Sequence, residues 1–304
     1  MKIAVVVITY NDDYKLKEWR HWHEEYKDDI ALHIIVDNSS KPEYLKQVEE
    51  LFPDSVILKR DSNGGCTSAY NDGIRYALSR PDITHIALVG NDIRIEKGAL
   101  IKCVELLDSD EQLGMVAPVL LEADSDIISD FGDIISSKLI LNQYGEGVRV
   151  KDMPIKKRYC EAVTGGMNIS KRSFYERVGL QDENLFMYSD EADMGLRAKL
   201  LGIKMAVTLE AKSWHQHIKS PVVIKRHPYS SYLIARNKVY LAYKHFDSQK
   251  VREIFNYYFW NGLSHYVTCI IRFQFDRAQS FRWQMLGAWY GLRKNMKPNK
   301  YSSL

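Results

Sequence analysis

Short apolar runs alternate with helical patterns through the first 92 residues, and this alternation limits the possible folds more than any other feature. The apolar runs are rich in Val and Ile and end in polar residues; they cover 2–10, 31–40, 55–60 and 83–92. Segments whose apolar residues recur at helical intervals lie between them, at 14–27, 42–52 and 65–80. The pattern predicts an α/β fold in which helices cover both faces of a mainly parallel sheet.

Polar residues end each of the four expected strands, and in parallel sheets ligands bind beyond those carboxyl ends. The residues are Thr9, Tyr10 and Asn11, then Asp37, Asn38 and Ser39, then Asp61 to Gly65, and finally Asn91 and Asp92. One such group alone is typical of a turn or a helix N-cap, but four in succession favour a ligand site. Asn63-Gly64-Gly65 also opens a helix, where backbone amides attract anions, with a simple turn as the alternative.

Two side chains are candidates for binding a divalent cation. Asp92 follows the run "HIALVG" at the mouth of an expected strand, and a carboxylate there suits a hard cation. His215 closes another expected strand, and an imidazole beside a carboxylate would complete a manganese or magnesium site. The alternatives are a capping Asp and a partly exposed His, and His217 competes with His215 for the role.

An acidic stretch, "LFMYSDEADMGLRAKLLG", covers residues 185–202. Asp190, Glu191 and Asp193 fall in the first turn of an expected helix, where the helix dipole favours negative charge. Asp193 also stands four residues before Arg197, the spacing of an ion pair. These effects do not account for three carboxylates within four residues, because like charges repel one another and each carboxylate raises the pKa of its neighbours. That arrangement suits a general base.

Charge is segregated along the chain, although the formal net charge is only +3. Residues 225–304 hold 14 Lys and Arg against 3 acidic residues, a formal charge of +11, which leaves −8 for the first 224. The tail therefore favours an anionic partner surface. A nucleic-acid binder is disfavoured, because acidic residues dominate the first part and nucleic-acid motifs are lacking.

The segment 254–273 is apolar and aromatic, but polar residues interrupt it: Asn256, Asn261, Ser264, His265 and Arg272. A membrane-spanning helix needs about 20 mostly apolar residues, so we expect helices at a membrane interface instead. Packing within a helical subdomain, or a contact between two copies of the chain, is an equal alternative. The four cysteines are scattered, which fits reduced thiols in the cytosol.

With these residues in order, the chain resembles the family 2 glycosyltransferases, which have the nucleotide-sugar-binding GT-A fold. The resemblance covers most of the first 240 residues. It rests on eight segments in the family's order, which are "VVVITYND", "IIVDNSS", "SNGGCTSAYNDGI", "LVGNDI", "VTGGMNISKRSF", "DENLFMYSDEADMGLRAKLLG", "SWHQH" and "IARN".

The resemblance implies a role for each matching residue. Thr9, Tyr10, Asp37 and Asn38 would bracket the base and ribose, Asn63, Gly64 and Gly65 would face the sugar nucleotide, and Gly165 and Gly166 would border the donor sugar. Asp92 would bind metal and diphosphate, with His215 as second ligand. The Gly90-Asn91-Asp92 motif lacks the family's first acidic residue. The base motif, Asp190-Glu191-Ala192-Asp193, has Glu where Asp is usual, so either Glu191 or Asp190 takes the proton, and the register favours Glu191.

The function implied is transfer of a sugar with inversion, dependent on a divalent cation (Mn or Mg). The donor would be dTDP-rhamnose or UDP-galactofuranose, with a UDP-hexose as a further option. The acceptor would be a hydroxyl of a growing, lipid-linked cell-surface glycan such as a capsule or O antigen, reached from the cytoplasmic face of the membrane. We expect a catalytic domain at 1–224 and a basic, aromatic helical region at 225–304. A sugar-nucleotide-binding or scaffold protein with impaired catalysis is the alternative.

Overall fold

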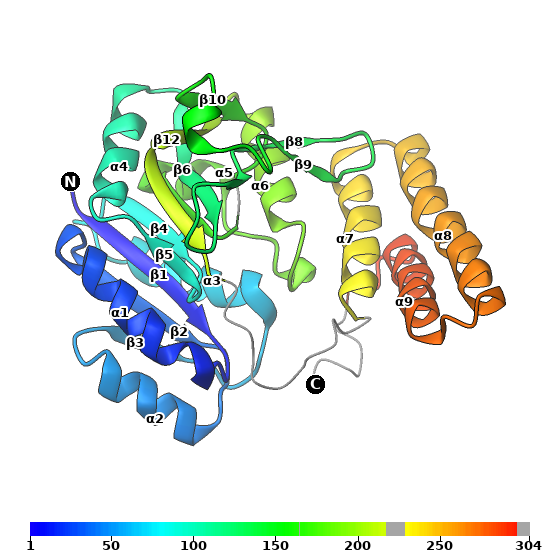
Figure 1. Cartoon of the computed structure of the whole chain (residues 1–304), viewed down its shortest axis with the longest axis horizontal. Coiled ribbons are helices and arrows are strands. Elements are labelled where there is room, and N and C mark those ends of the chain that lie inside the picture. Colours follow the sequence, from blue (N-terminus) through cyan, green and yellow to red (C-terminus); the bar gives the residue numbers. More distant parts are fainter. Residues whose placement is uncertain (164, 217–228, 297–304) are drawn as a thin grey trace.

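The computed structural model describes residues 1–163, 165–216 and 229–296 and forms two bodies (Figure 1). The larger body is built on a ten-stranded sheet with the strand order β10-β12-β6-β11-β4-β1-β2-β3; β5 pairs with β12, and β7 pairs with β6. The smaller body consists of the helices α7, α8 and α9, which lie beside the sheet body in Figure 1. The expected α/β fold with a C-terminal helical region is confirmed.

The first four strands are the parallel half of the sheet, as the sequence predicts. They are β1 (Ile3–Thr9), β2 (Leu32–Asp37), β3 (Val56–Lys59) and β4 (His85–Val89). The helices between them are α1 (Leu16–Tyr26), α2 (Pro42–Leu51) and α3 (Gly65–Leu78). Short 3-10 turns flank α1, namely η1 (Asp13–Lys15) and η2 (Lys27–Asp29).

Alternate side chains of β1 explain why helices cover both faces. Val5 and Val7 pack into one core with α1 and α2, whereas Ala4 and Val6 pack into a second core with α3. Gly73 of α3 lies so close to Val6 that a side chain there would clash.

The other half of the sheet is mixed rather than parallel. β12 (Lys204–His215) runs parallel to β6 (Leu113–Glu122), and β11 (Met167–Lys171) lies antiparallel between β6 and β4. The antiparallel additions are β5 (Ile93–Ile95), β7 (Ile128–Asp130) and β10 (Lys157–Cys160). A separate hairpin joins β8 (Asp133–Ile135) to β9 (Leu141–Gln143). The remaining elements of this half are α4 (Ala99–Ser109), α5 (Arg172–Val178), α6 (Asp190–Leu200), η3 (Val150–Asp152) and η4 (Glu183–Leu185).

One sequence expectation about this half is wrong. The pattern around Gly165 and Gly166 predicts a strand that leads into the glycines, but β11 follows them. Met167 and Ile169 are fully buried in the core, whereas Ala162, among the described residues just before the glycines, makes an isolated bridge to Asp133. Burial of both faces of β11 therefore places the strand on the far side of the turn.

The smaller body contains α7 (Tyr229–His245), α8 (Ser248–Ile271) and α9 (Phe275–Leu292). Glycines let α9 approach α7 closely, because Gly287 lies against the carbonyl of Tyr232 and Gly291 lies against the carbonyl of Arg236. Within the described residues, none of the helices is long and apolar enough to cross a membrane. The expected boundary between residues 224 and 225 lies outside the described residues and stays a prediction.

Candidate active site

The carboxyl ends of β1 and β4 bring two of the predicted donor-site residues together. Thr9 is buried, and its hydroxyl is hydrogen-bonded to the hydroxyl of Tyr44. The Asn91 amide donates to Thr9 Oγ1 over 3.5 Å and to the carboxylate of Asp12 over 2.9 Å. Tyr10, the next residue along, is 39% exposed. The edge predicted from strand ends thus exists, and Tyr44 and Asp12 are members that the sequence did not indicate.

The predicted residues at the ends of β2 and β3 form a second hydrogen-bonded group. The Asn38 amide donates to Asn63 Oδ1 (2.9 Å) and accepts from the Gly64 amide (3.2 Å), and Asn63 Oδ1 also accepts from the Gly65 amide (2.9 Å). The carboxylate of Asp37 accepts from the backbone amide of Ser40 over 3.1 Å. These side chains therefore fix the loops that border the start of α3.

Gly65 begins α3 at a point where the chain needs glycine. Its φ is +79°, and a side chain there would clash with the carbonyl of Phe186. The same carbonyl accepts from the Thr67 amide over 3.3 Å. The start of α3 is therefore in contact with the loop that leads into α6.

The predicted cation ligands lie next to each other at the ends of β4 and β12. His215 Nε2 is 3.6 Å from Asp92 Oδ2, and the Gln216 amide donates to the Asp92 carbonyl over 3.0 Å. Burial alone would raise the pKa of Asp92, but His215 and Lys15 hold the pKa of this carboxyl well below its usual range. Asp92 therefore carries its negative charge in the folded protein.

The donor set at this position fits a divalent cation in its chemistry. One carboxylate and one imidazole, both partly exposed, are ligands that Mn²⁺ accepts, and the neighbouring Asn91 amide adds an oxygen. Among the described residues, the structure contains no group of three His, Cys, Asp or Glu side chains that could hold a metal ion without other ligands. A cation here would thus need further oxygens, which a nucleoside diphosphate would supply. His217 lies outside the described residues.

Asp190 and Glu191 begin α6, as the sequence predicts. Burial, and then the neighbouring Glu191 carboxylate, raise the pKa of Asp190 well above its usual range. Gly165 lies against the Glu191 carboxylate, so that a side chain at this glycine would clash with it. Next along, the carbonyl of Gly166 accepts from the Gly90 amide over 2.8 Å. The Gly165-Gly166 turn therefore lies between the carboxylate pair and the Gly90-Asn91-Asp92 turn.

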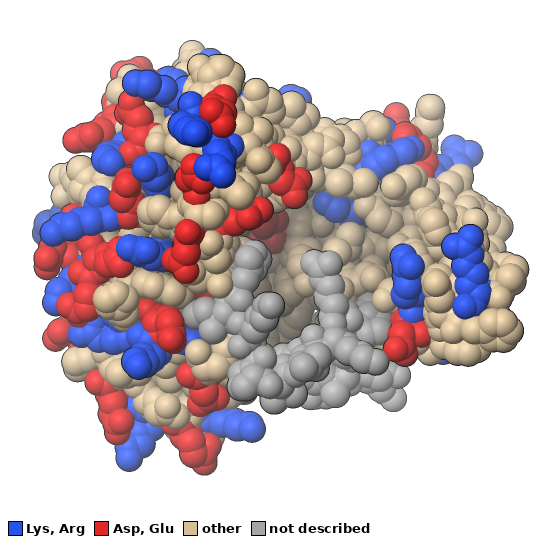
Figure 2. Space-filling model, in the orientation of Figure 1, with Lys and Arg blue, Asp and Glu red and all other residues tan. Residues whose placement is uncertain are grey.

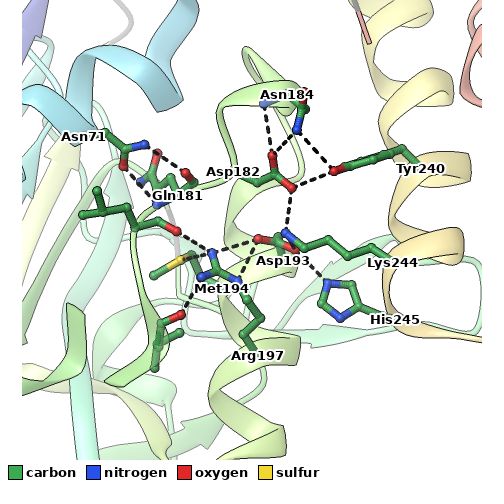
Figure 3. Close-up of polar contacts among 12 residues, drawn as sticks. Asn71, Gln181, Asp182, Asn184, Asp193, Met194, Arg197, Tyr240, Lys244 and His245 are labelled. Atoms are coloured by element: carbon green, nitrogen blue, oxygen red, sulfur yellow. Dashed lines mark hydrogen bonds and ion pairs between the residues drawn. The ribbon is translucent and has the colours of Figure 1, made fainter. Parts of the chain in front are cut away.

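The third acidic residue of α6 has a different environment. Asp193 is fully buried, and its carboxylate is 2.8 Å from Arg197 Nη2, 2.8 Å from Lys244 Nζ and 2.7 Å from His245 Nε2 (Figure 3). Burial would raise the pKa of Asp193, but these three groups lower it to about 2. The expected pair with Arg197 is confirmed. The two partners from the end of α7 were missed because they lie about 50 residues away in sequence.

The loop before α6 is strained. Phe186, Tyr188 and Ser189 have φ angles of 64°, 69° and 69°, which non-glycine residues rarely adopt and which cost about 1–3 kcal/mol each. Such a conformation persists only where the surroundings hold it. Both sides of the loop are in fact held, by α3 at Phe186 and by α7, the first helix of the smaller body.

Two buried residues of α7 bind the carbonyls of this loop. The Asn237 amide donates to the carbonyls of Leu185 (3.0 Å), Met187 (2.8 Å) and Tyr188 (2.9 Å). Arg236 donates to the carbonyls of Asn184 (3.1 Å) and Leu185 (2.9 Å). The sequence motif "IARN" contains both residues, but the sequence does not reveal their role, because nothing local identifies the loop that they hold.

Three more ionisable groups lie near Asp190 and Glu191, and sequence reasoning missed them. Burial raises the pKa of Asp130 to about 6 and that of Asp133 to about 7, and the Glu191 charge adds to both. Burial lowers the pKa of Lys238 to about 8, against the attraction of Glu191, Asp190 and Asp133. The two aspartates end β7 and begin β8 in "SDFGD", so polar residues at strand ends were a usable signal.

The chain is similar to a known protein family and to known proteins. Residues 4–126 match the family model described as Glycosyl transferase family 2. The dTDP-rhamnosyl transferase RfbF of Shigella flexneri is 27% identical over 216 residues, which cover 70% of this chain and 68% of that protein.

Three solved structures are also similar. GalNAc-T7 with UDP, GalNAc and Mn²⁺ has a TM-score of 0.65 at 13% identity. The match covers 98% of this chain but 58% of GalNAc-T7, so this chain spans less than two thirds of that protein. The mannosyltransferase PcManGT of Pyrobaculum calidifontis, with GDP-Man and Mn²⁺, has a TM-score of 0.55 at 14% identity, and the match covers 96% of this chain and 74% of that protein. S. aureus TarS 1-349 with UDP-GlcNAc has a TM-score of 0.56 at 16% identity, and the match covers 97% of this chain and 88% of that protein. At these identities the likeness shows the fold alone, which is the GT-A fold expected from the sequence.

Proposed function

We propose that this chain, which belongs to glycosyl transferase family 2, moves a sugar from a nucleoside-diphosphate donor to a hydroxyl of a growing cell-surface glycan. The relative from Shigella flexneri is named a dTDP-rhamnosyl transferase, so dTDP-rhamnose is the favoured donor. UDP-galactofuranose and a UDP-hexose are the further donors to test.

The observation that carries this proposal is that one turn, Gly165-Gly166, contacts both sides of the site: Gly165 lies against the Glu191 carboxylate, and Gly166 is hydrogen-bonded to Gly90 of the Gly90-Asn91-Asp92 turn. Glu191 takes the proton from the acceptor hydroxyl, and the oxygen then attacks the anomeric carbon opposite the diphosphate. The new C–O bond forms as the bond to the diphosphate oxygen breaks, so the configuration inverts. Burial and the Glu191 charge together raise the pKa of the adjacent Asp190, which is evidence that the two carboxyls of this pair lie close together.

The donor would lie along the carboxyl edge of the sheet. Thr9, Tyr10, Asp37 and Asn38 would bracket the nucleoside, and the start of α3 at Asn63, Gly64 and Gly65 would present its amides to the nucleotide. Asp92 and His215 would hold a Mn²⁺ or Mg²⁺ ion. When bound, that ion neutralises negative charge on the leaving diphosphate, so departure needs no general acid.

We assign the acceptor side to the smaller body and propose that this body rests on an anionic membrane at its cytoplasmic face. The turn between α8 and α9 exposes large apolar side chains, with Ile271 at 70%, Phe273 at 80% and Phe275 at 59%. Arg272 and Arg277 are exposed among them. Charged residues crowd the sheet body in Figure 2, whereas the face over α8 and α9 is mostly uncharged. Aromatic and basic groups together suit a lipid interface, and a contact between two copies is the alternative.

Transfer assays with a panel of donors, with and without Mn²⁺, test the function. We expect product from dTDP-rhamnose or UDP-galactofuranose with an isolated glycolipid acceptor, and its loss in Asp92→Asn and Glu191→Gln. Nucleotide binding without transfer to any acceptor would favour the alternative, a binding or scaffold protein, which the Asn91 position motivates.

Sedimentation with phosphatidylglycerol vesicles tests the proposed membrane surface, by comparing the unmodified chain with the double variant Phe273→Ser/Phe275→Ser. Equal sedimentation of both would contradict it.

A further inference from the structure

A lysine lies at the position where the proposed cation would bind. Lys15 ends η1, and its Nζ is 3.2 Å from Asp92 Oδ2, 3.2 Å from Asn91 Oδ1 and 3.8 Å from Asp12 Oδ2. Its side chain is only 13% exposed. An ammonium group surrounded by two carboxylates and an amide oxygen occupies an oxygen cage of the kind that hard divalent cations prefer.

Hydrogen bonds between the members fix this cage. The Asn91 amide donates to Asp12 while its oxygen accepts from Lys15, so the two sides of Asn91 are used differently. His215 lies on the far side of Asp92, 3.6 Å from the same Oδ2 atom that Lys15 contacts. The lysine and the imidazole therefore share the one carboxylate that the proposed function makes a metal ligand.

We propose that the Lys15 ammonium is a resident cation that competes with a divalent cation for Asp92. This inference rests on the proposed function, because it takes Asp92 as the ligand. In the free protein Lys15 neutralises Asp92 and holds the Asn91–Asp92 turn in place. A divalent cation can bind Asp92 only when Lys15 releases it, and the phosphates of an arriving nucleotide would provide Lys15 with a new partner. Metal and nucleotide therefore bind better together than either does alone.

A titration of the full chain with Mn²⁺, without nucleotide, tests this competition. Electron paramagnetic resonance of the free ion measures how much Mn²⁺ is bound. Lys15→Met removes the charge and keeps the length of the side chain, so we expect affinity for Mn²⁺ to rise by about tenfold or more. Lys17→Met is the matched control, because Lys17 is exposed on α1 and carries the same charge. Its effect should be less than about twofold, since an exposed charge is screened by salt.

The outcomes separate the inference from the function on which it rests. Equal affinity in Lys15→Met and the unmodified chain, or an equal rise in Lys17→Met, would overturn the competition. Adding Asp92→Asn to Lys15→Met should abolish the tighter binding; if Mn²⁺ still bound, the metal ligand itself would be misassigned. Thermal unfolding checks that each variant is folded. Lys15→Gln, which can still donate to Asn91, is the second variant, and it should also bind Mn²⁺ more tightly.

Discussion

One turn of α6 contains two carboxylate environments of opposite character. Burial and a neighbouring carboxylate raise the pKa of Asp190, whereas Arg197, Lys244 and His245 lower that of Asp193 against the same effect of burial. The helix dipole acts similarly on both positions, so it cannot separate them. The difference comes from Arg197, one turn further along α6, and from α7, which supplies Lys244 and His245 to Asp193 (Figure 3). The ionic partners of Asp193, rather than the helix start, separate this anchoring residue from the pair Asp190–Glu191, which we propose as the base.

Replacement of Glu191 should have the largest effect and should fall on activity alone. Glu191→Gln removes the proposed proton acceptor, so we expect the transfer rate to fall by on the order of 10³-fold, within the range typical of a general base. Nucleotide affinity and thermal unfolding should change little. Steady-state kinetics with a saturating donor measures the fall, and a rate near that of the unmodified chain would exclude Glu191 as the base.

Replacement of Asp193 should instead fall on stability. Asp193→Asn leaves Arg197, Lys244 and His245 without the carboxylate that they share, and a broken buried ion pair costs about 3 kcal/mol or more. Urea unfolding followed by circular dichroism measures this loss. Glu253→Gln on α8 is a suitable control, since its partners Lys138 and Lys250 are partly exposed and their pairing is worth little. Comparable losses in both variants would contradict the anchoring role.

Acid should remove the same contribution without any mutation. The pKa of Asp193 is about 2 in the folded protein and about 4 in an unfolded chain, so the pairing is worth about 2–3 kcal/mol at neutral pH. That stability is complete above pH 4 or so and is lost as the pH falls towards about 2. Urea unfolding of the chain and of Asp193→Asn should therefore converge over this range. A constant gap between them would show that Asp193 is not the group that titrates.

Asn237 connects the two environments, because it holds the loop that leads into α6. Asn237→Ala leaves the carbonyls of Met187 and Tyr188 without that amide, which we expect to cost about 2 kcal/mol of stability. Since the loop positions Glu191, transfer should fall about tenfold, as misplacement of a catalytic group by about 1 Å can lower rates strongly. Nucleotide binding should be unchanged. Asn256→Ala, at an exposed position of α8, is the control; equal effects in both would deny Asn237 a positioning role.

Asp190 gives the smallest and most diagnostic change. A folded-state pKa raised above the unfolded value means that stability falls as pH rises through that interval, so the carboxylate is unfavourable at neutral pH. Asp190→Asn should therefore stabilise the protein at pH 7, and the gain should shrink towards pH 4. Differential scanning calorimetry at both pH values measures it. A loss of transfer as large as that of Glu191→Gln would make Asp190 the proton acceptor instead.

The sequence predicted most of the parallel half of the sheet and little of what surrounds the site. Buried runs such as 2–10 are unambiguous, because both faces of such a strand are apolar. The strand at Met167 was placed on the wrong side of Gly165-Gly166, since only the core partners of Met167 and Ile169 decide it. The strand-end rule found Asn91 and Asp92. It could not find Lys15, which belongs to a helical pattern, because its contact with Asp92 spans 77 positions.

Phe186 contacts both the sheet body and α7, two regions that a protein designer would wish to exchange separately. Its carbonyl contacts Gly65 and Thr67 of α3, and its ring belongs to a small apolar cluster with Tyr232 and Leu233 of α7. A chimera that took α7–α9 from a relative of different acceptor preference, but kept the native loop, would disrupt the loop even if each part folded well. The transferable unit therefore begins at Asn184 rather than at the start of α7, and it must include Asp190 and Glu191, the pair proposed as the base.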